Sequence, residues 1–301
     1  MSSQKIKKSI GLRLGQELWA MLGRWRQVTG LPWDNWALRL SLFPLAPLYV
    51  LRLGWAHGLG TLGRFFAGQG DFKIYRSQLD PGLYIRESST DAYVFQQIFI
   101  MQDYSRAQGR DKVYCIIDAG AYVGFSAIYF AELYPHAIIY AIEAESSNFH
   151  QLQKNIRNYP NIVAIHAALW SEDGWVSIGP DPAASGQWGF TVKANTSSTT
   201  AKLCPALSLS TFIDQYQITS IDIIKIDIEG AESTVFAPSS CHTWLAKVKF
   251  LIIELHDHLF PDSHQTFLTA MQHYEFAVQS QGENLLFDFQ NLERALKADL
   301  R

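Results

Sequence analysis

The feature that most constrains the fold is a run of alternating local patterns in the middle of the chain. An apolar segment from Cys115 to Asp118 leads into a turn with glycines at positions 120 and 124. A helix-like stretch follows, and a second apolar segment ends at Glu143. Glycine lets a chain reverse after a strand and leaves the backbone open to a ligand. The order therefore predicts strand, turn, helix and strand, with a carboxylate at the second strand's end.

The alternation continues along the chain and predicts the fold class. Expected strands lie at 113–118, 137–143, 162–168, 221–226 and 250–255, and expected helices at 125–134, 147–158, 230–236 and 263–274. Such alternation builds a mostly parallel, twisted sheet with helices on both faces. We therefore predict an α/β, Rossmann-like fold. Its ligands should bind outside the carboxyl ends of the strands, where the strand order reverses.

The turn also indicates the kind of cofactor. An acid about twenty residues after a glycine turn is placed to accept hydrogen bonds from ribose hydroxyls, and Glu143 stands at that distance. A dinucleotide site also needs a middle glycine, so that the backbone can approach a pyrophosphate. Here the middle of the turn is Ala121, Tyr122 and Val123. The residues therefore favour S-adenosylmethionine, which has no phosphate, over NAD.

Five segments carry a resemblance to a known family. They are DAGAYVGFS, AIEAESSNFHQLQKNI, VAIHAALWSEDG, DIIKIDIEGAES and FLIIELH, and KIDIEGAE is the most specific piece. Over about residues 84 to 256 the chain resembles the FkbM family of S-adenosylmethionine-dependent O-methyltransferases. The resemblance implies a class I methyltransferase fold and, as acceptor, a hydroxyl of a sugar, a glycolipid or a secondary metabolite. The chain departs from the family at Tyr122, where Asn is usual, and at Ala144, where Pro is usual.

The turn and the resemblance together predict the cofactor-binding residues. These are Asp118, Gly120, Tyr122, Gly124, Ser126, Glu143, Ala144 and Ala168. The resemblance places the adenine beside Ala168, and Glu143 is expected to bind the ribose.

The KIDIEGAE segment carries the candidate catalytic residues. Lys225, Asp227 and Glu229 alternate with isoleucines, so on an extended chain they share one face. Burying this face inside a sheet would be costly, so we expect it to line a cleft at the mouth of the strand. The next expected strand delivers Glu254 and His256 to an adjacent mouth. The alternative is a structural ion-pair network in which Lys225 binds Glu229 or Glu254.

Methyl transfer requires alignment of the acceptor and removal of its proton. We expect Asp227 to be the base or to orient the hydroxyl, with His256 as the alternative base. Lys225 would tune the carboxylates, and Glu229 belongs to the same predicted catalytic group. In a metal-assisted variant, Asp227 with Glu254 or His256 would hold Mg²⁺ or Mn²⁺, much as catechol-type methyltransferases use a strand-end Asp.

Charge and glycine content indicate two regions. Residues 1–70 form a basic, aromatic-rich, helical extension, and residues 71–301 form the main domain, with a core at about 110–290 and an insertion at about 169–210. Residues 1 to 80 carry eleven Lys and Arg against four Asp and Glu, while the remainder is acidic. A basic arm suggests a partner: an anionic membrane, a nucleic acid or the acidic domain itself, and of these we do not expect a nucleic acid.

Apolar positions between Ile6 and Trp25 recur at helical spacing among basic residues, so this segment docks either on the protein's own core or on a membrane. The run from Leu42 to Leu51 is too short to cross a bilayer. Glycines from 54 to 70 predict a loop-rich boundary, followed by short strands at 72–75 and 83–86. The insertion is expected to be a hairpin with a mobile loop near the acceptor, or else a surface elaboration.

Three widely spaced cysteines, without metal-binding spacing, favour a reducing compartment. We therefore expect a cytoplasmic protein, either free or bound peripherally to a membrane. Two other functions stay open from the residues alone. One is an NAD-linked oxidoreductase, and the other is a non-catalytic, membrane-associated scaffold that keeps the fold.

Overall fold

The computed structural model describes residues 45–67, 70–87, 89–180, 190–194, 202–256 and 263–290. The chain divides into two compact units, one made of Met1–Asp103 with Ser185–Trp188 and the other of Tyr104–Ala184 with Gly189–Arg301. This division falls after Asp103 and not at residue 70. The amphipathic segment predicted between Ile6 and Trp25 lies outside the described residues.

The first unit holds helix α3 (Ala46–Ala67), strands β1 (Phe72–Ile74) and β2 (Leu83–Ile85), helix α4 (Asp91–Phe95) and the π-helical turn η2 (Gln96–Met101). The two predicted strands are present and pair antiparallel. The loop predicted from the glycines is wrong up to residue 67, because α3 is interrupted only at Gly54. Phe65 is buried and its ring meets those of Phe72 and Phe95, at centroid distances of 5.7 and 6.3 Å. This burial outweighs the low helix propensity of the glycines, and it also ties residues beyond 70 to the first unit.

The second unit is built on a seven-stranded sheet in the order β12-β13-β11-β10-β3-β4-β5. The strands are β3 (Cys115–Ala119), β4 (Ile138–Glu143), β5 (Ile162–His166), β10 (Ile223–Ile226), β11 (Phe250–Ile253), β12 (Ala277–Gln281) and β13 (Asn284–Asp288). The five predicted strands run parallel, and β13 runs antiparallel to both of its neighbours, β11 and β12. The chain passes from β3 to β4 and β5 and then returns to β10, on the other side of β3. The predicted reversal of strand order is therefore confirmed, and it lies between β3 and β10.

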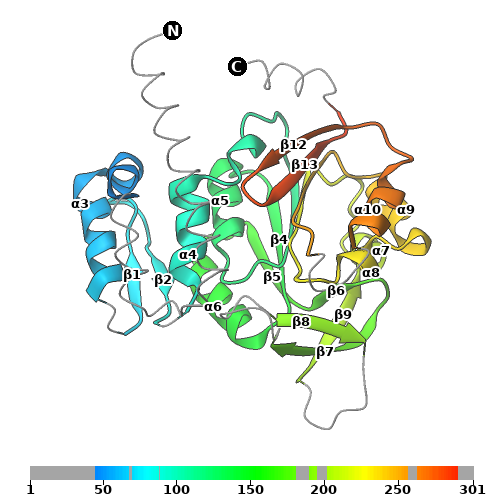
Figure 1. Ribbon diagram of the computed structural model, residues 1–301, viewed down its shortest axis with the longest axis horizontal. Helices are drawn as coiled ribbons and strands as arrows, with labels where there is room; N and C mark the ends of the chain where they lie inside the picture. The colour runs from blue at the N-terminus through cyan, green and yellow to red at the C-terminus, as the bar shows by residue number, and fades with distance from the viewer. Residues whose placement is uncertain are drawn as a thin grey trace. The chain divides into compact units, whose positions relative to one another are not determined.

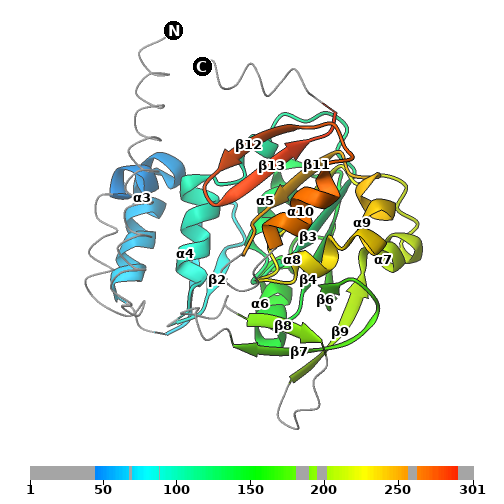
Figure 2. The ribbon, with the colours of Figure 1, turned by 45° about the vertical axis from the view of Figure 1, so that its right-hand side comes forward.

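Helices cover both faces of this sheet. They are α5 (Phe125–Leu133), α6 (Ser146–Ile156), α7 (Leu209–Gln215), α8 (Glu232–Val235), α9 (Pro238–Leu245) and α10 (Ser263–Met271). In Figures 1 and 2, α5 and α6 lie on one face and α7, α9 and α10 on the other. The α/β prediction is therefore confirmed, although α7, α9 and the β12–β13 hairpin were not predicted. Within the described part of the chain, no helix has the length and apolar character needed to span a bilayer.

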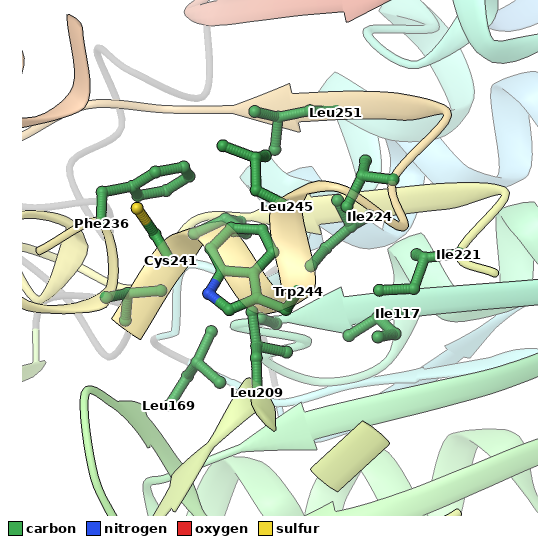
Figure 3. Packing of buried hydrophobic residues seen from close by; sticks show 14 of the residues in the cluster. Ile117, Leu169, Leu209, Ile221, Ile224, Phe236, Cys241, Trp244, Leu245 and Leu251 are labelled. Carbon is green, nitrogen blue, oxygen red and sulfur yellow. The ribbon is translucent and has the colours of Figure 1, made fainter. Parts of the chain in front are cut away.

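The main core lies between the sheet and the α7, α9 and α10 layer. Alternate strand residues, including Ile117 and Ile224, pack there around Trp244 of α9, which is 2% exposed (Figure 3). Because strand side chains alternate between faces, the residue that follows each of these isoleucines points to the opposite face, where α5 lies. Asp118 and Lys225 are such residues, which is why two charged side chains face α5.

The insertion forms more structure than the predicted hairpin. Strands β6 (Ala168–Trp170), β7 (Gly174–Pro180), β8 (Phe190–Ala194) and β9 (Lys202–Ser208) make a second sheet, in the order β6-β9-β7-β8. The hairpin itself is present as the antiparallel pair β7–β8. Val176, Ile178 and Cys204 give this sheet a small core of its own. The mobile loop predicted for this region lies outside the described residues, at 181–189 and 195–201.

Candidate active site

The predicted site residues gather at the carboxyl ends of four adjacent strands. Glu143 ends β4, Asp118 is the penultimate residue of β3, Asp227 follows β10, and His256 lies just after β11. These strands are neighbours in the order β11-β10-β3-β4 and all run parallel. Their ends therefore lie along one edge of the sheet, on both sides of the point where the strand order reverses, which is where ligands bind in such folds.

The glycine turn joins the ends of β3 and β10 very closely. Gly120 has a φ of +78°, and a Cβ atom added to it would lie 1.7 Å from the carbonyl oxygen of Asp227. Glycine at this position is therefore required by the backbone that follows β10. Gly124, with a φ of +87°, precedes α5, where a Cβ atom would crowd Leu152 and Ile156. Both glycines thus have a structural reason that does not depend on a ligand.

Glu143 is held by the turn and faces it. Its Oε2 accepts a hydrogen bond from the backbone N–H of Tyr122, and its Oε1 accepts one from the N–H of Glu145, both at 2.9 Å. Tyr122 adopts a left-handed φ of 51°. Burial raises the pKa of Glu143 to about 7, although these backbone donors act to lower it. The Asn148 side chain also hydrogen-bonds this carboxylate. A carboxylate has about four acceptor sites, so beside these three donors it retains acceptor capacity for the ribose.

Asp118 and Lys225 form a buried pair between neighbouring strands. They are register partners on β3 and β10, and Lys225 Nζ lies 3.4 Å from Asp118 Oδ1. Ser126 donates its hydroxyl to Asp118 Oδ2 at 2.6 Å. Burial raises the pKa of Asp118, while Lys225 and Ser126 act to lower it. The predicted cofactor residues Asp118 and Ser126 thus contact each other and brace the start of α5.

Lys225 corrects one expectation from the sequence. We predicted that its face would line a cleft, but the Lys225 side chain is only 3% exposed. Its Nζ donates to the carbonyl oxygen of Gly120 at 2.7 Å and lies 3.4 Å from Asp227 Oδ2. Burial acts to lower the pKa of Lys225, but Asp227 and other anionic neighbours raise it by more, so the ammonium stays charged. Burial is tolerated because the charge is paired on several sides. Its ion-pair partners are therefore Asp118 and Asp227, not the predicted Glu229 or Glu254.

The ends of β10 and β11 bring three carboxylates around one imidazole. His256 Nε2 lies 3.5 Å from Glu229 Oε2, 3.5 Å from Glu254 Oε1 and 3.8 Å from Asp227 Oδ1. The side chains of these three acids are 23, 25 and 27% exposed, respectively. Burial lowers the pKa of His256, but the surrounding carboxylates raise it to about 12. Burial also raises the pKa of Glu229, to about 8, against the effect of His256.

Two residues without a predicted role belong to this site. Glu232 is fully buried, and its Oε1 lies 2.7 Å from His256 Nδ1. Tyr104 is buried against Phe130 and interacts electrostatically with Lys225. Glu232 lies within the KIDIEGAE segment, so its position was visible in the sequence but its partner was not. No spacing marked Tyr104, because it precedes the first strand of the sheet.

The two predicted alanines contribute mainly packing. Ala168 is 1% exposed and belongs to the core of the second sheet, and Ala144 packs against the same cluster. Nearby, the ring of His166 stacks on Phe149 at 4.7 Å, and its Nε2 lies 3.1 Å from the Ala144 carbonyl oxygen. The adenine contact predicted at Ala168 therefore stays a prediction.

Comparisons with known proteins identify the family. Residues 118–282, more than half of the chain, match the family model described as the methyltransferase FkbM domain. No curated protein matches the chain. One similar solved structure is the FkbM methyltransferase of Methylobacillus flagellatus, at 14% identity and a TM-score of 0.42. The alignment covers 85% of this chain and 61% of that one, so this chain spans about three fifths of its length.

Two further solved structures contain the cofactor or its product. Aeropyrum pernix fibrillarin in complex with S-adenosyl-L-methionine is 11% identical, with a TM-score of 0.36, and 73% of this chain and 82% of that one are covered. The N-terminal domain of human METTL16 in complex with S-adenosylhomocysteine is 11% identical, with a TM-score of 0.34 and coverages of 85 and 94%. The likeness to these two proteins is weak, and the assignment depends on the family match. The chain belongs to the FkbM family of S-adenosylmethionine-dependent methyltransferases.

Proposed function

We propose that the protein transfers a methyl group to a hydroxyl of a sugar, a glycolipid or a secondary metabolite. The observation that carries this proposal is the position of Asp227 against the cofactor turn. Its backbone N–H donates to Ala119 at 3.1 Å, and its carbonyl oxygen fills the space beside Gly120. Its carboxylate is nevertheless 27% exposed. A partly exposed base is thereby held next to the turn where a methyl donor would bind.

The residues around the turn fit S-adenosylmethionine. Glu143 supplies acceptor oxygens for the ribose, and the backbone N–H groups of Tyr122 and Glu145 hold its carboxylate in place. Lys225, which lies beside the turn, is held by Gly120 and two carboxylates, so it is not available to a pyrophosphate. When bound, the cofactor supplies an electrophilic methyl group, and its transfer forms an O–C bond, breaks the S–C bond and leaves S-adenosylhomocysteine and a proton.

Asp227 is the residue that we assign to the acceptor's proton. Lys225 fixes its Oδ2 from 3.4 Å, so the carboxylate is oriented before the acceptor arrives. His256 is a less suitable base, because both of its ring nitrogens already face carboxylates. General-base catalysis by a positioned side chain is worth about 10²–10⁴-fold in rate.

The proposed reaction is tested with S-adenosylmethionine that carries a labelled methyl group. The purified protein is incubated with a panel of sugars, glycolipids and hydroxylated secondary metabolites. We expect label in an organic product as a base-stable methyl ether, together with stoichiometric S-adenosylhomocysteine. Label on nitrogen or carbon, or in an ester, would contradict transfer to a hydroxyl. A dinucleotide-dependent oxidation without methyl transfer would favour the oxidoreductase instead.

For the partner of the N-terminal region, we propose an anionic membrane surface. Helix α3 exposes Leu51, Trp55 and Leu59, which are 56, 75 and 51% accessible. The helix carries Arg52 and Arg64 and no acidic residue, within a strongly basic part of the sequence. Exposed apolar side chains beside basic residues are typical of segments that lie on anionic bilayers. The three cysteines, all free, support a working site in the cytoplasm.

Membrane contact predicts that the protein co-sediments with vesicles containing phosphatidylserine and much less with pure phosphatidylcholine. Trp55→Ser should lower the bound fraction, because it removes the largest exposed apolar side chain of α3. Trp175→Ser is the matched control, because Trp175 is 59% exposed but lies on β7. Equal binding by both variants, or no binding by the wild type, would contradict this partner.

A further inference from the structure

The side chains of Asp227, Glu229, Glu254 and His256 form one group, which we call the acid–histidine group. Asp227, Glu229 and His256 each offer a ligand atom, and these atoms lie within 4.8 Å of one another. Glu254 Oε1 lies 3.5 Å from His256 Nε2. We propose that the acid–histidine group binds one divalent cation of the kind that accepts carboxylate and imidazole ligands, with Mn²⁺ as the best match.

The setting of His256 supports a metal site and not only an acidic surface. Its side chain is 7% exposed, and Nδ1 lies 2.7 Å from Oε1 of the fully buried Glu232. Histidines that bind metals commonly donate one ring N–H to a carboxylate, which fixes the tautomer and turns the second ring nitrogen toward the ion. Here that nitrogen is Nε2, and it faces the three partly exposed acids. The other oxygen of Glu232 is buried and has no hydrogen-bond partner among the described residues.

Around the acid–histidine group, the negative charges of the described residues outnumber the positive ones. Five carboxylates stand beside only two cationic groups, Lys225 and His256. The five are Asp118, Asp227, Glu229, Glu232 and Glu254. Like charges held this close at low exposure repel one another, and a divalent cation would offset that repulsion. When such an ion binds, it replaces the ring proton of His256 as the positive charge among these acids.

The distances are compatible with one shared ion. Two ligand atoms that are each about 2.1 Å from an ion, at angles between octahedral and tetrahedral, are about 3.0–3.5 Å apart. The 3.5 Å separations from His256 Nε2 to Glu229 and Glu254 meet this condition. Asp227, at 3.8 Å, needs only a small side-chain movement. Mg²⁺ prefers oxygen ligands and retained waters, so the imidazole favours Mn²⁺.

The metal site follows from these contacts alone, whereas its role depends on the proposed function. Beside Asp227, the ion would bind the acceptor oxygen and lower the pKa of the hydroxyl. Asp227 would still take up the acceptor's proton, and the bonds formed and broken at the methyl group would be unchanged.

The test is direct binding of Mn²⁺ to the full-length protein after removal of metals with a chelator. Free Mn²⁺ is followed by electron paramagnetic resonance, and we expect one ion per chain. Pulsed measurements should show coupling to an imidazole nitrogen that disappears in His256→Gln. Glu232→Gln, which changes only the group holding His256, should weaken binding by about 10–100-fold. His136→Gln and Glu275→Gln, both at exposed positions, are controls that should bind like the wild type.

Each variant is checked by thermal unfolding, and Glu254→Gln, at a partly exposed side chain, replaces any variant that does not fold. Failure of the wild type to bind Mn²⁺ would overturn the proposal, as would equal affinity in all variants or the absence of nitrogen coupling. The proposed function is judged separately. Methyl transfer by chelated protein without Mn²⁺ binding would refute the site and keep the reaction. Mn²⁺ binding without any methylated product would keep the metal site and refute the proposed reaction.

Discussion

Asp227→Asn should lower the rate of methyl transfer by about 10²–10⁴-fold while affinity for S-adenosylhomocysteine stays close to that of the wild type. Asparagine is similar in shape, and the backbone contacts of residue 227 with Ala119 and Gly120 do not involve its side chain. The amide cannot take up the acceptor's proton. It also loses the charge that faces Lys225 Nζ at 3.4 Å. Single-turnover kinetics with labelled cofactor measure the rate, and calorimetry with S-adenosylhomocysteine measures binding.

Asp111→Asn is the matched control, because Asp111 is exposed and lies before the first strand of the sheet. It should retain wild-type rate. A comparison with Asp227→Ala separates the two roles open to Asp227, since asparagine retains hydrogen-bonding capacity and alanine does not. Equal loss in both variants indicates a base, and a smaller loss in the asparagine variant indicates orientation of the acceptor. Wild-type rate in Asp227→Asn would remove Asp227 from the reaction and favour His256, the alternative base.

Glu143→Gln should weaken binding of S-adenosylhomocysteine by about a hundredfold. Hydrogen bonds to a charged group contribute about 1.5–3 kcal/mol each, and the ribose would lose its charged acceptor. The amide also places an NH₂ group against one of two backbone N–H donors, those of Tyr122 and Glu145. Calorimetry measures the affinity, and thermal unfolding shows whether the turn is intact. Glu172→Gln, at an exposed position in the insertion, is the control.

The pH dependence gives a second measure of the same carboxylate. Its pKa is raised by burial from 4.5 to about 7, so it becomes protonated on the acid side of neutrality. Affinity for S-adenosylhomocysteine should therefore fall between about pH 8 and pH 6, and the profile of Glu143→Gln should be flatter. For folding the sign is opposite, because the folded state binds this proton more tightly. The contribution of Glu143 to stability decreases as the pH rises from 4.5 to about 7. A wild-type affinity that does not change over this range would argue against Glu143 as the ribose acceptor.

Much of the second unit could be predicted from local patterns. Each of the five parallel strands combines an apolar run with a neighbouring turn. The ends of β4, at Glu143, and of β10, at Ile226, were predicted to the residue, whereas β11 ends at Ile253 and not at 255. The elements that were missed have weaker local signals. The β12–β13 hairpin alternates only partly, and α9 is a short helix whose place depends on Trp244 entering the core. The helix over residues 55–67 was missed because its glycines suggest a loop, and only the burial of Phe65 overrides them.

The sequence by itself determined the order of the five parallel strands, the turn after β3 and the set of charged residues at the strand ends. These depend on local spacing, which a single chain displays directly. Only the tertiary structure decided which charges meet. Asp118 pairs with Lys225 because β3 and β10, more than a hundred residues apart, are neighbours in register. Glu232 supports His256 for a similar reason, since the start of α8, which follows β10, lies against the residues after β11. Such partners are selected by strand order and by the cost of burying an unpaired charge, and neither is written in local spacing.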